Sequence, residues 1–310
     1  MPRSSSVGGS LGPAARAQWP SRLLERLLET SLLGCALLSL SITAGIVLML
    51  GWQTLAFLQV VPLRALLFDT QWTPLFEQQH FGIWPLVAGT CLTSGIALAV
   101  AVPLGLLAAV YSSELAPQGV RRYLKPALEL LAGIPSIVYG YFALVWVTPV
   151  LQRMVPGLAG FNALGAGSVL GIMLIPMICT LSEDALLAVP RTLREGALAL
   201  GASRLATIFR VVLPAAGSGI AASVILAASR AVGETMIVTI AAGQEARLTL
   251  DPRVPIETLT AYVVQVSRGD VASGSLEYRT LFVVGALLFV LTLVMNALSL
   301  QLQRRFRGAI

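Results

Sequence analysis

Residues 190–214 read PRTLREGALALGASRLATIFRVVLP and lie between two long apolar runs. Apolar residues recur at helical spacing on both sides of Gly201, namely Leu193, Ala197 and Leu200 before it and Leu205, Ile208 and Val212 after it. Pro190 suits the first turn of a helix, glycine permits a tight turn, and Pro214 is expected to end the second helix. The segment 190–215 is therefore predicted to be two short helices that form a knob outside the membrane. Such a knob can enter a groove on another protein, and an ordinary surface loop is the alternative.

The composition around this segment is that of a membrane protein. Of the 310 residues 56% are hydrophobic and only 12% are charged, and the mean hydropathy is +0.82. Six apolar runs can each hold the helix of about 20 residues that crosses a bilayer. They lie at about 31–51, 83–111, 127–150, 168–189, 216–242 and 280–303. We predict an all-α polytopic membrane protein with six transmembrane helices over residues 31–303.

The positions of the positive charges predict the orientation. Fourteen of the 21 Lys and Arg residues lie in the two tails, in the connection between the second and third runs, and in 190–215, whereas six lie on the opposite side. Cytoplasmic segments carry such an excess. The tails 1–30 and 304–310 and the loop 190–215 are thus expected in the cytoplasm of a bacterial inner-membrane protein. The net charge of +6 reflects this bias, so we expect membrane lipid but no nucleic acid as a partner.

No motif for catalysis, metal binding or cofactor binding is present in the sequence. Cys35, Cys91 and Cys179 all lie in apolar runs without metal-ligand spacing, and His80 is the sole histidine. The Gly-x₄-Gly-Lys-Ser/Thr loop that binds nucleotide phosphates is missing. We therefore expect no catalytic residues, no metal and no cofactor.

The run Arg230-Ala-Val-Gly-Glu234-Thr235 places two charges inside the fifth apolar run. A charge at mid-bilayer costs about 2.5–3.5 kcal/mol, so it requires an interior site and a partner. Four residues apart on one helix, Arg230 and Glu234 would share a face, and Gly233 would let a ligand or a backbone approach. Arginine can donate two parallel hydrogen bonds to an oxyanion, and glutamate can accept one from protonated phosphate but not from sulfate. The alternative is a mutually satisfied pair that only holds helices together.

The docking segment resembles a known family. Its pattern Glu195-x-Ala197-x₃-Gly201-x₉-Val211-x-Leu213-Pro214 is similar to the EAA loop of ABC importer permeases. Gly196 and Val211 replace the usual alanine and isoleucine, and Gly196 weakens the helix by about 1 kcal/mol. The resemblance implies that this loop docks into an ATPase subunit through Glu195, Ala197, Gly201, Leu213 and Pro214.

Further segments resemble the permeases of the phosphate-specific ABC importer, and in particular its C-type (PstC-like) subunit rather than its A-type sister. These segments are 85–90, 102–106, 121–126, 131–140, 230–236 and 276–282, and the likeness covers about 80–305. The resemblance implies the type I (MetI-like) permease fold. It also implies a phosphate pathway lined by Arg230, Glu234 and Thr235.

Two further features leave alternatives open. Ile134-Pro135-Ser136 is expected to interrupt the third helix, because proline removes a backbone hydrogen bond. Ser136 and Tyr139 would then contact the substrate, or the interruption is a packing kink. Glu183-Asp184 near the end of the fourth run is either a gate or, as we favour, a pair of acids at a wet helix end.

The resemblance also implies the partners of the chain. These are a second, A-type permease, two ATP-binding subunits that hydrolyse ATP, and a periplasmic phosphate-binding protein. One alternative function is a permease for another oxyanion, such as molybdate, tungstate or sulfate. The other is a secondary transporter that works alone, although such folds usually have more spans or internal repeats.

Overall fold

The computed structural model describes residues 19–269, 271–272 and 274–307. The chain divides into two compact units, residues 1–49 and 50–310. The first unit contains most of helix α1 (Trp19–Leu58), of which Leu24–Leu58 is long and apolar enough to cross a membrane. Its side chains from 24 to 49 are exposed, as suits a surface that faces lipid. Residues 19–30 of the predicted tail are thus helical, and residues 1–18 lie outside the described part.

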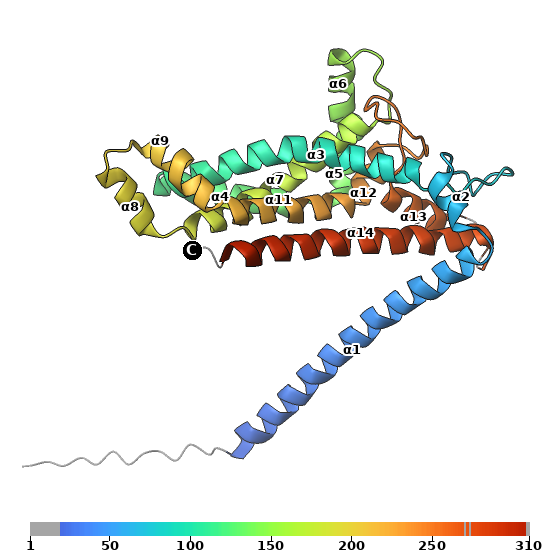
Figure 1. The fold of residues 1–310 in the computed structure, drawn as a ribbon, viewed down its shortest axis with the longest axis horizontal. Coiled ribbons are helices and arrows are strands. Elements are labelled where there is room, and N and C mark those ends of the chain that lie inside the picture. Colours follow the sequence, from blue (N-terminus) through green and yellow to red (C-terminus); the bar gives the residue numbers. More distant parts are fainter. Residues whose placement is uncertain (1–18, 270, 273, 308–310) are drawn as a thin grey trace, which may run out of the picture. The chain divides into compact units, whose positions relative to one another are not determined.

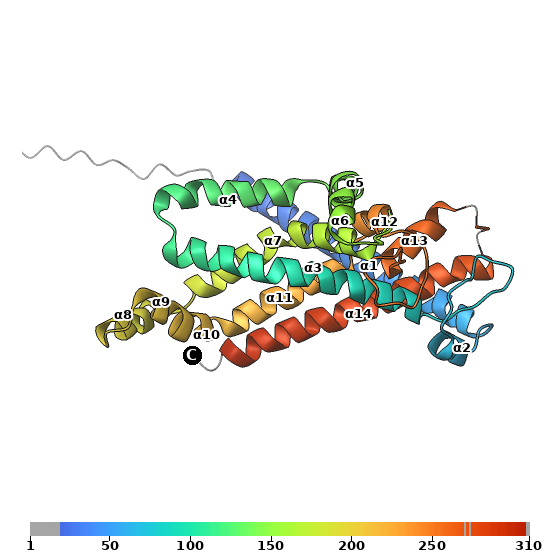
Figure 2. The same cartoon turned by 90° about the horizontal axis from the view of Figure 1, so that it is seen from above.

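Four helices of the second unit run beside one another (Figures 1 and 2). They are α3 (Trp84–Val110), α7 (Ala163–Leu187), α11 (Gly217–Val232) and α14 (Leu276–Arg307). The α3–α7 pair packs closely because glycines face the neighbouring backbone. A Cβ atom at Gly171 of α7 would lie only 2.7 Å from the carbonyl oxygen of Ala97 in α3.

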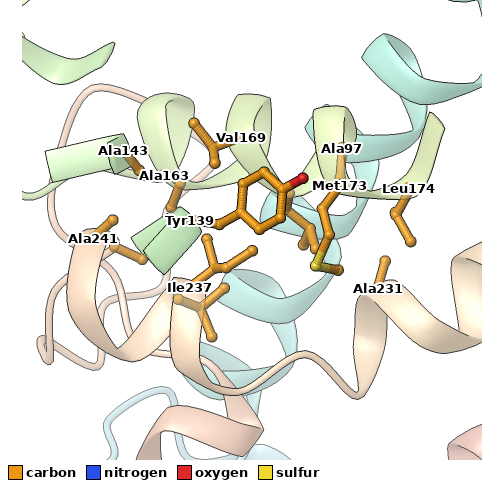
Figure 3. Packing of buried hydrophobic residues seen from close by; sticks show 14 of the residues in the cluster. Ala97, Tyr139, Ala143, Ala163, Val169, Met173, Leu174, Ala231, Ile237 and Ala241 are labelled. Atoms are coloured by element: carbon orange, nitrogen blue, oxygen red, sulfur yellow. The ribbon is translucent and has the colours of Figure 1, made fainter. Parts of the chain in front are cut away.

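Small and aliphatic residues and the aromatic ring of Tyr139 form the buried core around α7. Figure 3 shows the ring of Tyr139 among Val169, Met173 and Ile237, all of them buried. The Tyr139 hydroxyl donates a hydrogen bond to the carbonyl oxygen of Leu131, 2.7 Å away. The hydroxyl of this buried side chain is therefore hydrogen-bonded within the fold.

The third span is broken where proline predicts a break. Helix α4 (Gln118–Gly133) ends before Pro135, and α5 (Ser136–Phe142) begins directly after it. The π-helical turn Ala143–Val147 then joins α5 to α6 (Thr148–Met154). The two halves differ in direction by 88°. A second bend, of 66°, separates Arg204–Ala215 from Gly217–Val232. Within the described residues, four helices are long and apolar enough to cross a membrane, or up to six if each bent pair counts as one span. The predicted all-α polytopic class is confirmed.

Short helices gather at the two ends of the second unit (Figures 1 and 2). One end holds the π-helical turn Tyr111–Leu115 that follows α3. It also holds the predicted knob, built from α8 (Arg191–Ala199), α9 (Arg204–Thr207), the π-helical turn Ile208–Val212 and α10 (Leu213–Ala215). Helix α14 ends at the same end of the unit, and its last residues, 304–307, are helical where a tail was predicted. Residues 308–310 are outside the described part.

The opposite end holds α2 (Leu63–Phe68) and α13 (Leu259–Arg268), with an isolated bridge between Trp72 and Phe81.

Candidate functional site

Arg230 and Glu234 lie on either side of a helix break. Helix α11 ends at Val232, residues 233–235 are not helical, and α12 (Met236–Ala241) begins directly after them. The prediction that the two charges share one helical face is therefore wrong. The break has two causes: the Glu234 carboxylate oxygen Oε1 accepts a hydrogen bond from Met236 N–H at 3.2 Å, and the Thr260 hydroxyl donates to the Glu234 carbonyl at 2.7 Å. The Glu234 carboxylate thus satisfies a backbone donor in the first turn of α12, whose N-cap residue is Thr235.

Arg230 has no ion-pair partner within 4.0 Å among the described residues, and its side chain is exposed. The alternative of a mutually satisfied Arg230–Glu234 pair is therefore not realised in this part of the chain. Gly233 is also exposed, and a Cβ atom built there would meet only the carbonyls of Ser229 and Arg230 at ordinary distances. No other helix among the described residues comes within 4 Å of this Cβ position, and the glycine ends α11 instead of packing against a neighbour.

Arg230 lines a cavity of about 370 Å³ between α4, α7 and α11. Four other polar side chains line the same cavity: Lys125 and Glu129 from α4, and Thr180 and Glu183 from α7. The predicted site residues do not include Lys125, Glu129 or Thr180. A signal for two of them is present in the sequence, because Lys125 and Glu129 are one turn apart on a helix and so share a face.

Glu183 is buried rather than wet, with only 4% of its surface exposed. Its Oε1 atom accepts hydrogen bonds from Arg121 Nη2 at 2.6 Å and Ser112 Oγ at 3.2 Å, and Lys125 Nζ lies 3.5 Å away. The favoured prediction of a wet acidic helix end is wrong for Glu183 and holds for the exposed Asp184. Burial is tolerated because basic groups of α4 reach this carboxylate.

The other predicted pathway residues do not line this cavity, and this holds for Glu234 as well as for Ser136, Thr235 and Tyr139. Ser136 is half-buried at the start of α5, and Thr235 is half-buried with its hydroxyl 3.3 Å from the Gly233 carbonyl. Tyr139 is buried and bonded to Leu131 across the break at Pro135. This bond favours the packing-kink alternative for Tyr139, whereas contact of Ser136 and Thr235 with a substrate stays a prediction.

The knob has the predicted two-helix form. Gly201 joins the helices with φ +83°, a backbone conformation that side-chain-bearing residues rarely adopt. Glu195 is exposed, Ala197 is half-buried, and Leu200 is 91% exposed. The chain thus presents an apolar side chain to its surroundings at the glycine turn.

Three hydrogen bonds of Arg194 anchor the base of the knob. Arg194 donates hydrogen bonds to the carbonyls of Leu186 and Val189, at 2.7 and 2.9 Å, and to Glu114 at 2.9 Å, so α8 is tied to the end of α7 and to the turn after α3. Pro214 does not end the second helix, which continues to Ala215. In the π-helical turn before it, Leu213 N–H bonds to the Ile208 carbonyl, five residues back. The wider turn carries the chain through Pro214, and the helix ends one residue later, at Ala215, where the direction changes by 66°.

The sequence of this chain matches a known protein family. Residues 101–308 match the family described as "Binding-protein-dependent transport system inner membrane component". The chain is 32% identical to the probable ABC transporter permease protein YqgH of Bacillus subtilis, over 87% of this chain and 88% of that protein. It is 33% identical to the phosphate transport system permease protein PstC of Mesorhizobium japonicum, over 89% of each chain.

Solved structures share the fold at lower identity. A chain of a bacterial alginate ABC transporter, crystallised with an alginate-bound periplasmic protein, superposes with a TM-score of 0.62. The alignment covers 94% of this chain and 98% of that chain at 17% identity. Fold, family model and relatives agree: this chain is a multi-pass permease that belongs to the family of binding-protein-dependent transport system inner membrane components.

Proposed function

We propose that this chain is the C-type permease subunit of an ATP-driven importer and forms half of an inorganic phosphate pathway. Relatives at 31–34% identity that carry the name phosphate transport system permease protein PstC support the substrate. The residue pattern around Arg230 supports it independently, since a guanidinium and a carboxylate together suit an oxyanion that still carries a proton.

The observation that carries the proposal is the Arg230 guanidinium, which lines a cavity and has no ion-pair partner in the described part of the chain. It lines the space between α4, α7 and α11, where an anion would find two parallel donors. Glu234 follows on the other side of the helix break, where its Oε1 atom accepts a hydrogen bond from the Met236 N–H. Its second carboxylate oxygen has no hydrogen-bond partner among the residues described, and it is the atom we assign to a proton of the substrate.

The two ends of the second unit are assigned to different partners. We assign the exposed α8 knob, with Glu195, Ala197 and Gly201 at its centre and Leu213 and Pro214 at its base, to docking on one of two ATP-binding subunits. A second, A-type permease would complete the pore, and a periplasmic phosphate-binding protein would deliver substrate at the α2 and α13 end. Helix α14 ends on the α8 side, which supports a cytoplasmic C-terminus. ATP would act by shifting the balance between inward-open and outward-open states.

The test uses the complete importer in proteoliposomes with external phosphate as substrate. We expect Arg230→Gln to abolish ATP-dependent phosphate uptake, since the oxyanion loses its bidentate donor. Glu234→Gln should lower phosphate uptake about tenfold or more and let sulfate compete, because the carboxylate that accepts the substrate proton is gone.

Arg122→Gln provides the control, because Arg122 is an exposed arginine of α4 that does not line the cavity. It should transport phosphate as the unmodified importer does. Full phosphate uptake by Arg230→Gln would overturn the proposed pathway. Preferred uptake of sulfate or molybdate by the unmodified importer would overturn the choice of phosphate.

A further inference from the structure

The cavity at Arg230 extends along α7 toward the knob. Its α7 lining runs from Met173 to Glu183, ten residues or about 15 Å of helix. Met173 belongs to the buried core around Tyr139, together with Ala231, the residue after Arg230. Glu183 lies one turn before the end of α7, where Arg194 of the knob is bound. Arg230 and Lys125, which lies beside Glu183, therefore stand at opposite ends of the cavity.

Lys125 is the most loosely held of the groups around Glu183. The Glu183 Oε1 atom accepts hydrogen bonds from Arg121 at 2.6 Å and from Ser112 at 3.2 Å. The Lys125 ammonium lies farther from the same atom, at 3.5 Å. The Lys125 side chain is 51% exposed, compared with 33% for Arg121. Arg121 does not line the cavity, whereas Lys125 does. Glu183 therefore keeps two partners when Lys125 moves.

The charges that line the cavity balance only when Lys125 is included. Arg230 and Lys125 oppose Glu129 and Glu183. An anion that leaves Arg230 toward the knob would meet two carboxylates, and like charges in a site of low dielectric repel strongly. A mobile ammonium at that end cancels the repulsion and offers three donors.

We propose that Lys125 is a second anion-contacting residue of the pathway, at the end of the cavity nearer the knob, and that it exchanges Glu183 for the passing anion. Between passages Glu183 holds the ammonium in place. When the anion arrives, Lys125 binds it, and Arg121 and Ser112 keep Glu183 satisfied. This inference rests on the proposed function and adds a residue and a step to it.

Transport kinetics of the complete importer test the role of Lys125. We expect Lys125→Gln to lower the kcat of phosphate uptake about tenfold, the effect of losing one charged hydrogen bond, with little change in KM. Lys125→Arg should restore most of the kcat because it keeps the charge. Arg122→Gln removes a charge from an exposed position of the same helix that does not line the cavity, and it should behave as the unmodified importer.

A protection experiment tests direct contact. Lys125→Cys and Arg122→Cys are each placed in a Cys35→Ser, Cys91→Ser background, in which the buried Cys179 remains. An anionic methanethiosulfonate reagent should label both, and excess inorganic phosphate should slow labelling of Lys125→Cys alone.

The outcomes separate this inference from the proposed function. If Lys125→Gln transports at the full rate while Arg230→Gln is inactive, the assignment of Lys125 is wrong and the phosphate pathway stands. Equal labelling rates of Lys125→Cys with and without phosphate would also overturn the assignment. If Arg230→Gln transports phosphate normally, the pathway itself is wrong.

Discussion

Glu257 is a buried carboxyl outside the spanning helices, two residues before α13. Only 3% of its surface is exposed, and its Oε1 atom has no hydrogen-bond partner within the described part of the chain. Burial raises the pKa of this carboxyl to about 8. Glu257 is therefore largely protonated at neutral pH, and sequence alone gives no sign of it, because the burial depends on the packing of α3 and α13 around it.

This pKa predicts a pH dependence of stability. Between pH 4.5 and 8 the folded chain keeps a proton that the unfolded chain has lost, so stability falls as pH rises through that window. The stabilisation that Glu257 contributes is fully present below pH 4.5. Across the window the free energy of unfolding falls by at most about 1.4 kcal/mol per pH unit. Glu257→Gln cannot ionise and should flatten the thermal melting profile of the detergent-solubilised complex between these limits. Glu245→Gln, an exposed control, should leave the profile unchanged, and parallel profiles for all three proteins would refute the prediction.

At the scale of single elements, the sequence predicts some breaks and misses others. Pro135 signals the break between α4 and α5 because proline lacks a backbone donor. The break after Val232 has no such signal, because it depends on the contact between Thr260 and the Glu234 carbonyl, 26 residues away. Pro214 signals the end of the second knob helix to within one residue, since α10 ends at Ala215 and a 66° bend follows. Local chemistry thus predicts the breaks at proline and misses the one that depends on a tertiary contact.

The glycines of the knob give a matched pair of variants. Gly201 has φ +83°, so Gly201→Ala strains the turn by about 1 kcal/mol, and we expect less phosphate uptake per ATP hydrolysed. Gly196 lies within α8 with open space around it, so Gly196→Ala should strengthen the helix by about 1 kcal/mol and leave this ratio unchanged. The ratio is measured with both activities in the same proteoliposomes. An identical ratio for the two variants would show that the geometry of the knob does not govern coupling.

For the whole molecule, the apolar runs predict the helices well, because each must satisfy its own backbone in lipid. Their ends are less predictable: α4 begins at Gln118, nine residues before the predicted third run, and α14 continues to Arg307. The candidate site could be predicted only in part. Arg230 and Glu234 are visible as charges in an apolar run, whereas Lys125 and Glu183 meet across 58 residues of sequence. Such a pairing arises from packing of α4 against α7, which no local pattern encodes.

The central claim is that this chain conducts phosphate only as part of an ATP-driven assembly. The most direct test measures entry of radiolabelled phosphate into proteoliposomes that contain this chain and its A-type partner, with and without the ATP-binding subunits and the binding protein. We predict uptake that requires every component and ATP, and that stops with Arg230→Gln. Phosphate uptake by the permease chains alone, driven by an ion gradient, would contradict the account and identify a secondary transporter.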